Sequence, residues 1–326
     1  MLFLFLANIS LGSVAIPLKN TLQIIFTNNS VSESWQYIIW NYRIPKAFTA
    51  ILVGSGLGLS GLLMQTLFRN PLAGPFVLGI SSGASLGAAL LIMGASIFSG
   101  LFSFNIFNDA TLAIASSVGS FLVLFAVLSV AMKVKDTMSL LIIGLMFGSI
   151  TGAVVSILSY FTTAEKLQQY IYWSFGSLGD LSWTQLCLLS CIILVGVFLS
   201  ILSIKSLNAL LLGENYAQSL GVQLKKSRLI IIIATGLLAG SITAFAGPIA
   251  FIGLAVPHLT RQIFNTTNHK ILVPAVLVYG AIIMLICDTI AQLPFSSSVL
   301  PINAITSIVG APVVIWLLIR KRKMVF

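Results

Sequence analysis

Few side chains in this sequence could carry out bond-making chemistry. Among its 326 residues are seven Asp and Glu, two His and three Cys. Cys187 and Cys191 are four residues apart and would share one face of a helix, while Cys287 lies in another apolar run. These spacings indicate neither a disulfide framework nor a metal site. His258 and His269 are too few for a metal or haem site on their own, so no catalytic residue, cofactor or resident metal is predicted.

Nucleotide chemistry is not indicated either. Residues 221–227 are the nearest match to a phosphate-binding loop, but Lys225 and Lys226 stand where the motif needs Gly-Lys, and no strand-helix unit begins there. Asp288 is the one acid well inside an apolar run, which makes it a functional candidate by default. Its place near one end of that run favours a local pairing over a role in proton coupling.

The composition indicates that the chain is embedded in a membrane. Hydrophobic residues make up 58% of the chain and charged residues 7%, whereas soluble domains carry roughly 25% charged residues. The sequence therefore predicts an all-α polytopic membrane protein with a single transmembrane domain over residues 1–326. The net charge of +10 does not indicate nucleic-acid binding, because the basic residues lie in short loops and a tail.

Ten hydrophobic stretches could cross roughly 30 Å of hydrocarbon. The first is barely long enough, which suggests a start further upstream. Before the second, four aromatic residues within residues 35–42 are typical of a helix lying at the headgroup level. Within the second, Gly54, Gly58 and Gly61 have the spacing that lets a neighbouring helix approach closely. The predicted spans cover residues 1–18, 47–68, 77–98, 111–132, 138–161, 183–204, 229–245, 248–261, 271–292 and 301–319.

The distribution of Lys and Arg predicts the orientation of these spans. Thirteen of the 17 basic residues fall on one side and four on the other, namely Lys19, Arg43, Lys46 and Lys166. The more basic side marks the cytoplasm, so both termini are predicted to be cytoplasmic. Spans two to five and seven to ten would then run in opposite senses, as in an inverted repeat.

Residues 205–228 form the longest stretch that is too polar for hydrocarbon. Gly213 interrupts the preceding apolar run, Glu214 suits the positive end of a helix, and Gly221 is placed as its stop. A short helix is therefore predicted between the two glycines. Tyr216 and Leu220 would give it an apolar face for a soluble partner, and an ordinary basic cytoplasmic loop is the alternative.

Five motifs follow one another along the chain: RIPKAFTAILVGSGLGLSG at 43–61, MQTLFRNPLAGPFVLGISSGA at 64–84, LLLGENYAQSLGV at 210–222, GPIAFIGLAVPHLTR at 247–261 and GAPVVIWLL at 310–318. Over residues 40–320 the chain resembles the permease subunits of bacterial ABC importers for iron–siderophores, haem and cobalamin, the FecCD type. The resemblance implies a fold of the cobalamin-permease type in the bacterial inner membrane. It also implies partners: a second copy or a homologous permease, two ATPase subunits that bind ATP and Mg²⁺, and a periplasmic or lipid-anchored binding protein.

The resemblance assigns roles to two groups of residues. One group would dock on the ATPase: Gly213, Glu214, Ala217 and Gly221. The other would line the translocation path and its gate: Asn70, Ser81, Ser82, Gly83, Gly148, Thr151 and Gly152. Small residues let backbones pack when a gate is shut and leave space when it opens, although plain helix packing is the alternative. The span at 138–161 would line the path beside its copy in a second subunit, as a smooth wall.

At the outer side the resemblance implies that Arg43 and Lys46 grip acidic residues of the binding protein. The two residues are three apart and share a helix face, and snorkelling to headgroups is the alternative. Family members often carry an Arg where this chain has Gln292 and a Glu where it has Val299. A less charged docking surface is therefore expected.

The function implied is ATP-driven import of a metal chelate, with a ferric siderophore as the first choice of cargo and haem or cobalamin as alternatives. An ion-coupled secondary transporter would need paired buried acids or carbonyl cation sites, and Asp288 alone argues against it. A membrane-embedded enzyme would need a cluster of His, Asp or Cys at membrane depth. His258 is expected to make a helix-terminal hydrogen bond rather than a cargo contact.

Overall fold

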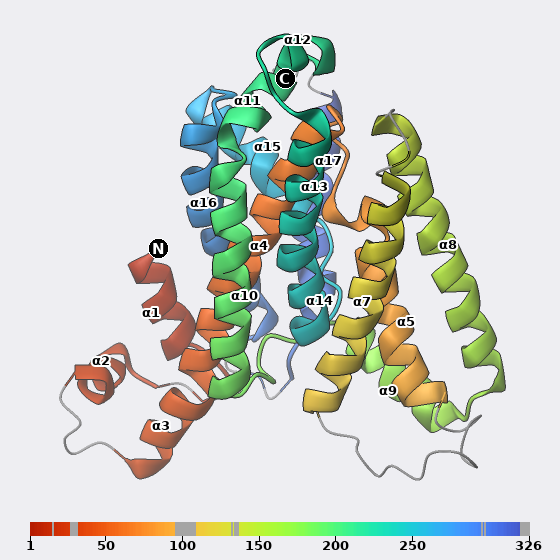
Figure 1. Ribbon diagram of the computed structural model, residues 1–326. Helices are drawn as coiled ribbons and strands as arrows, with labels where there is room; N and C mark the ends of the chain where they lie inside the picture. Colours follow the sequence, from red (N-terminus) through yellow and green to blue (C-terminus); the bar gives the residue numbers. More distant parts are fainter. Residues whose placement is uncertain are drawn as a thin grey trace.

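The computed structural model of the chain describes residues 1–14, 16–26, 32–94, 109–131, 133, 137–294, 296 and 298–319, and the secondary structure in these ranges is helical. Figure 1 shows long helices standing side by side. The short helix α12 (Glu214–Ser219) lies at one end, and α3 (Glu33–Ile38) and α9 (Ala164–Ser174) lie at the other. The all-α prediction is confirmed for the described residues.

Among the described residues, six helices are long and apolar enough to cross a membrane. Two shorter apolar helices, Ile80–Gly94 and Ile302–Trp316, occupy further predicted spans. The predicted count of ten spans is therefore not confirmed, and residues 95–98 of the third span lie outside the described ranges. The six long helices are Glu33–Leu67, Ala110–Ala131, Met138–Phe161, Trp183–Leu202, Leu224–Ala246 and His269–Ala291.

The first predicted span is interrupted. Helix α1 covers Leu2–Ser10, and the backbone is extended at Leu11, with φ −80° and ψ 153°. Pro17 disfavours helical backbone at the residue before it, and α2 (Leu18–Phe26) begins only after this proline. The prediction of one span over residues 1–18 is wrong, because the nine residues of α1 rise only about 14 Å.

The aromatic stretch before the second span does not form a separate helix. Helix α3 continues through the π-helical turn η1 (Ile39–Arg43) into α4 (Ile44–Leu67), so residues 33–67 are one helical run. The π turn ends two residues before Pro45, whose ring and missing N–H disturb α-helical bonding to the preceding turn. The residues expected to form a separate headgroup-level helix are therefore one end of the second span itself, the end far from α12 (Figure 1).

Helix α4 is the one around which most helices of the larger group pack. Within its apolar window 78% of the residues are buried. A Cβ atom built on Gly61 would lie 1.7 Å from the carbonyl oxygen of Gly253, and one on Gly54 would lie 2.2 Å from that of Gly280. The predicted close approach at these glycines is confirmed. The helices in contact with α4 include α10 (Trp183–Leu202), α13 (Leu224–Thr235), α15 (Ile252–Phe264) and α16 (His269–Ala291).

A second group of helices stands beside this core (Figure 1). Helix α5 (Ile80–Ala89) packs on α7 (Asp109–Ala131), and α8 (Thr137–Phe161) packs on α5 from the outside. Only 17% of the apolar window of α8 is buried. The remaining elements are η2 (Pro75–Leu78), η3 (Leu90–Gly94), α11 (Ile204–Leu211), η4 (Gly236–Gly240), α14 (Ser241–Ala246) and α17 (Ile302–Ile319).

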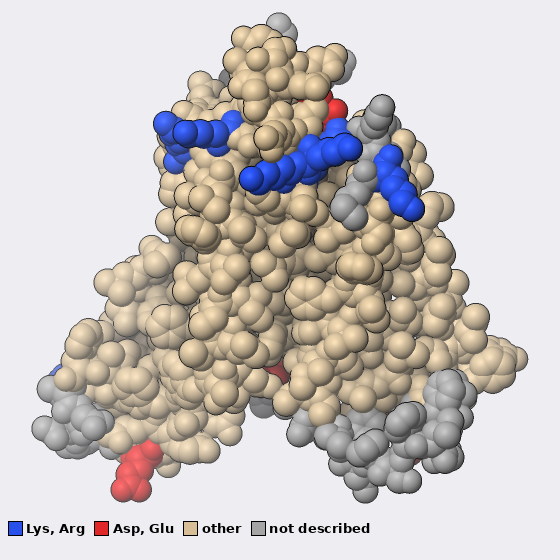
Figure 2. All heavy atoms as spheres, viewed as in Figure 1, with Lys and Arg blue, Asp and Glu red and all other residues tan. Residues whose placement is uncertain are grey.

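Most of the basic side chains visible in Figure 2 lie just below α12. This agrees with the predicted grouping of cations at one end of the spans. Lys135 and residues 320–323, which were counted in that group, lie outside the described ranges. The direction of the chain across the membrane and the inverted repeat stay predictions.

Candidate functional site

Residues 212–223, between α11 and α13, form a projection at the basic end of the molecule (Figure 1). Helix α12 begins directly after Gly213, whose φ of 108° is one that L side chains rarely adopt. At its other end, the Val222 amide donates to the Ala217 carbonyl (3.0 Å) while Gly221 has a φ of 83°, which is a Schellman stop. The predicted short helix between the two glycines is confirmed.

A buried side chain and an ion pair help to hold the projection in place. Ala217 is fully buried, and the Glu214 carboxylate accepts a hydrogen bond from Nη2 of Arg228 at 2.5 Å. Tyr216 and Leu220 are 54% and 59% exposed on its outer side. An exposed aromatic and an exposed aliphatic side chain offer a soluble protein an apolar anchor. Docking of the four predicted residues on an ATPase stays a prediction.

The turn at residues 68–72, directly after α4, lies beside this projection. Arg69 has a left-handed backbone with φ 46°, and the Asn70 side chain closes the turn by accepting from the Leu72 amide at 2.9 Å. Nε2 of His258, on α15, donates to the Pro71 carbonyl at 2.8 Å. His258 thus makes a hydrogen bond, as expected, but its acceptor belongs to a turn 187 residues earlier in the chain. This bond fixes the turn to α15.

The residues predicted to line a path fall at different places around α5 and α8. Ser82 lies against Gly148, where a built Cβ atom would be 3.3 Å from the serine Oγ. The Ser81 hydroxyl is 3.4 Å from that of Thr243 on α14, and Gly83 packs against the backbone of Gly119 on α7. The structure thus brings α5 and α8 together through small residues, while Asn70 stays on the turn.

Helix α8 turns a large apolar face outward. Thr151 points inward and its Oγ1 donates to the Phe147 carbonyl at 3.1 Å, whereas a Cβ atom built on Gly152 would meet no atom within 4 Å. Helices with so little burial inside one copy face either lipid or another protein. The exposed apolar side chains on this helix include Met138, Ile142, Leu145, Met146, Ile150, Val154, Ile157, Tyr160 and Phe161.

At the opposite end of the molecule, Arg43 is engaged within the chain. Its Nη1 donates to the carbonyl oxygens of Ile9 (2.6 Å) and Ser10 (2.9 Å), and its Nη2 donates to that of Val14. The carbonyls of Ile9 and Ser10 end α1 and have no helical partners of their own, and Val14 lies in the turn that follows. Arg43 therefore ties α1 to the start of α4, and its predicted contact with a binding protein is not tested.

Lys46 is also engaged, in an ion pair with Asp288. The Nζ atom of Lys46 is 3.1 Å from Oδ1 of Asp288, and the two side chains are 20% and 2% exposed. Oδ2 of Asp288 accepts from Nδ2 of Asn8 at 2.9 Å and from Nε2 of Gln292 at 2.8 Å. The expected local pairing of Asp288 is confirmed. Gln292 stands where family members often carry an Arg, and here its amide donates a hydrogen bond to the buried carboxylate of Asp288. Val299 is exposed nearby.

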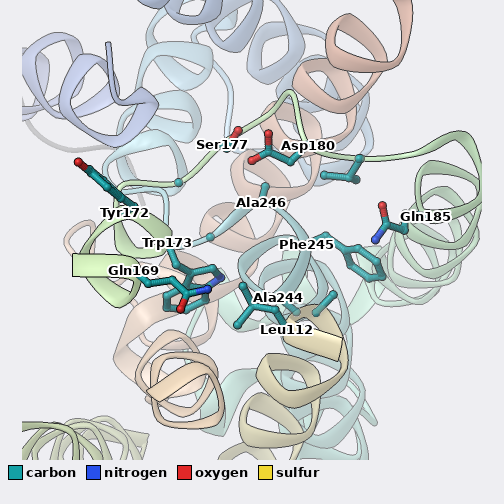
Figure 3. Close-up of a pocket in the computed structure, with 14 residues that line it drawn as sticks. Leu112, Gln169, Tyr172, Trp173, Ser177, Asp180, Gln185, Ala244, Phe245 and Ala246 are labelled. Atoms are coloured by element: carbon teal, nitrogen blue, oxygen red, sulfur yellow. The ribbon is translucent and has the colours of Figure 1, made fainter. Parts of the chain in front are cut away.

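A hollow of about 260 Å³ opens at this end between α7, α9, α10 and α14. Figure 3 shows Trp173 and Gln169 of α9 beside Ala244, with Ser177 and Asp180 together at the opposite side. Sequence reasoning missed this hollow, because its walls come from four segments. The neighbouring Tyr170 stacks on Trp173 with ring centroids 6.0 Å apart, and burial raises the pKa of its phenol, which stays neutral.

A helical bundle with membrane-length spans, a basic end and an amphipathic projection has the architecture of a transport permease. The model of the FecCD transport family matches residues 1–320, and the chain belongs to this family. It is 38% identical over 293 residues to the vitamin B12 import system permease protein BtuC of Klebsiella pneumoniae subsp. pneumoniae, covering 90% of this chain and 85% of that protein. The protein of the same name from Salmonella typhi is 36% identical over 294 residues, covering 90% and 87%.

Two solved structures share this fold. One is a transporter assigned to the metal-chelate type of ABC transporters, in an inward-facing conformation. It has a TM-score of 0.82 and 30% sequence identity, and the match covers 98% of this chain and 97% of that one. The other, PsaBC from Streptococcus pneumoniae in complex with Fab, has a TM-score of 0.54 and 14% identity over 92% of this chain and 95% of that one, and shows the fold alone. The chain is thus a transport subunit of the ABC permease type and not an enzyme.

Proposed function

We propose that this chain is the transmembrane subunit of an ATP-driven importer that moves a metal chelate across a bacterial inner membrane into the cytoplasm. The observation that carries the proposal is the projection at the basic end. Its exposed Tyr216 and Leu220 suit a docking surface for a soluble ATPase subunit. Residues 221–227 of this chain lack the phosphate-binding motif. The ATPase subunit would therefore bind ATP with Mg²⁺, and hydrolysis of that ATP would supply the energy.

The cargo is proposed to be cobalamin or a chelate of similar size. The relatives named as vitamin B12 permeases support cobalamin at least as strongly as a ferric siderophore, the first choice from the sequence. A ferric siderophore stays the second candidate, because the similar inward-facing transporter is assigned only to the metal-chelate type. A binding protein at the outer face would select the cargo, since the small residues near Ser82 and Gly148 offer no strong ligand.

Reconstitution tests the transport function and the cargo together. The permease would be placed in liposomes with the ATPase and binding protein of the same cell, and uptake of labelled cobalamin and labelled ferric siderophore would be measured with and without ATP. ATP-dependent uptake of cobalamin alone supports the first cargo, and uptake of the siderophore alone supports the second. Uptake without nucleotide would contradict the importer function.

A second copy of this chain is proposed to cover the outward face of α8. A cysteine at Ile150, which is 60% exposed, should form an intermolecular disulfide in membranes when Cys187 and Cys191 are replaced by Ser. A cysteine at Leu194, which is 65% exposed on α10, is the matched control and should stay monomeric. Equal crosslinking at the two positions would contradict pairing through α8.

The proposed orientation places the α12 projection in the cytoplasm. In whole cells of the same Cys-replaced background, a cysteine at Tyr216 should be protected from a membrane-impermeant maleimide and should react after lysis. A cysteine at Asp180, which is exposed at the opposite end, should react without lysis. The reverse pattern would show that the projection faces outward.

A further inference from the structure

A hollow of about 930 Å³ lies between the α12 projection and the turn that follows α4. Phe68 and Met138 contribute apolar walls from the end of α4 and the start of α8, and Tyr216 contributes one from α12. Three segments that are distant in sequence therefore meet at one opening at the basic end. Such a hollow could receive a protruding side chain of a partner protein.

Arg69 is the exposed cation of this hollow. Its φ of 46° is unfavourable for a residue with a side chain. Its guanidinium reaches Gly213, where a built Cβ atom would lie 3.5 Å from Nη1. Asn or Gly would hold this backbone at lower cost, so the occupation of the position by Arg points to a use for the guanidinium itself.

The charges around the hollow leave Arg69 without a counter-ion. Glu214 also lines the hollow, but its carboxylate is paired with Arg228 at 2.5 Å. Within the described ranges, the guanidinium of Arg69 makes no hydrogen bond or ion pair with the protein. Lys225 and Lys226, which follow α12 in the chain, add to the positive electrostatic potential at this end. A group that enters the hollow should therefore be acidic.

We propose that Arg69 receives an acidic side chain of the ATPase subunit, carried on a turn whose neighbouring apolar residue packs against Met138 and Tyr216. This rests on the proposed function and extends it. The ATPase would then contact the turn at residues 68–72 directly, in addition to α12. That turn leads into the segment containing Ser81 and is bonded to α15 through His258, so movement of the ATPase would reach both elements.

Crosslinking in the assembled transporter tests the contact. A photoreactive benzoylphenylalanine would replace Arg69, Tyr216 or Lys270 in turn, Lys270 being an exposed cation of the same end that does not line the hollow. Positions 69 and 216 should crosslink to peptides of the ATPase subunit, and position 270 should not. A crosslink at 216 without one at 69 would overturn this inference alone. Absence of ATPase crosslinks at both positions would instead count against the proposed function.

Charge variants provide the second measurement. Arg69→Gly keeps the left-handed turn without the guanidinium and should weaken ATPase binding about two- to fivefold, the range of a partly exposed ion pair. Arg69→Glu should weaken it further, whereas Arg69→Lys should retain part of the affinity and Lys270→Glu all of it. The affinity should also depend less on salt in Arg69→Gly.

Replacing the acid in the crosslinked ATPase peptide by Lys should restore binding to Arg69→Glu. Unchanged affinity of Arg69→Gly and Arg69→Glu, with an unchanged salt dependence, would refute the contact.

Discussion

The imidazole of His269 ties the start of α16 to the end of α4, because its Nε2 atom lies 2.8 Å from the hydroxyl oxygen of Thr66. Nδ1 and the backbone N–H of His269 both donate to Oδ1 of Asn208, at 2.8 Å and 2.9 Å. Asn208 belongs to α11, the helix that leads to the α12 projection. One fully buried ring therefore joins the projection to the core.

The first prediction concerns this ring. His269→Ala leaves Thr66 and Asn208 without their buried partner, and it should lower the free energy of unfolding by about 2 kcal/mol or more. Unfolding in detergent, followed by circular dichroism, measures the loss. His258→Ala, which removes one hydrogen bond at a partly exposed turn, is the control and should cost less. Equal stability of wild type and His269→Ala would show that the hydrogen bonds of this ring do not stabilise the fold.

The second prediction concerns the crossing of α4 and α15. Gly61→Ala would place a Cβ atom 1.7 Å from the Gly253 carbonyl, so the helices must separate, and the expected cost is about 1–3 kcal/mol. Thermal unfolding of the purified protein measures it. Gly152→Ala is the matched control, since nothing lies within 4 Å of its added atom. A stable Gly61→Ala variant with unchanged transport would contradict the close packing.

The third prediction concerns the buried ion pair between Lys46 and Asp288, at the end of the molecule opposite α12. Lys46→Met leaves Asp288, which is 2% exposed, without its cation, and this should destabilise the protein by about 3 kcal/mol. The double variant Lys46→Met with Asp288→Asn should recover most of the loss, because no charge remains buried.

Comparison of the single and double variants by thermal unfolding tests the pair. Lys166→Met, which removes a cation of the same end that forms no ion pair in the described part of the chain, should be neutral. If the single Lys46 variant were as stable as wild type but bound the binding protein less tightly, docking would be its main role.

The fourth prediction concerns the stop of α12. Gly221 has φ 83°, and a Cβ atom built on it would meet no atom within 4 Å. The backbone conformation, and not a steric clash, is therefore what favours glycine at this position. Gly221→Val should destabilise this backbone by about 1–2 kcal/mol, which displaces the projection in most molecules. Uptake should fall about tenfold, as that energy implies, while ATP hydrolysis continues and the protein remains in the membrane.

Paired assays of uptake and phosphate release distinguish lost coupling from lost assembly. Gly221→Asn is the control, because Asn tolerates left-handed backbone. Glu214→Lys, which breaks the pair with Arg228, should resemble Gly221→Val. Normal uptake by both Gly221→Val and Glu214→Lys would remove the coupling role of the projection.

The outlines of most helices followed from local sequence. Apolar runs with turn residues between them placed α8, α10 and α16 within a few residues of their bounds, and two glycines placed α12. Local patterns failed at Pro17 and Pro45. From local sequence, the helix could either break or continue near each proline. Contacts between distant residues, such as those of Arg43 with Ile9, Ser10 and Val14, determine the backbone path instead.

What the sequence determined by itself was membrane embedding, helical class, the short amphipathic helix between Gly213 and Gly221, and a family resemblance that the comparisons confirmed. These properties depend on residues close together in the chain. Only the tertiary structure decided which cations are engaged, that Asp288 is paired with Lys46, and that Arg69 lies beside Gly213. Such pairings join residues far apart in sequence, and their geometry is set by how whole helices pack around α4.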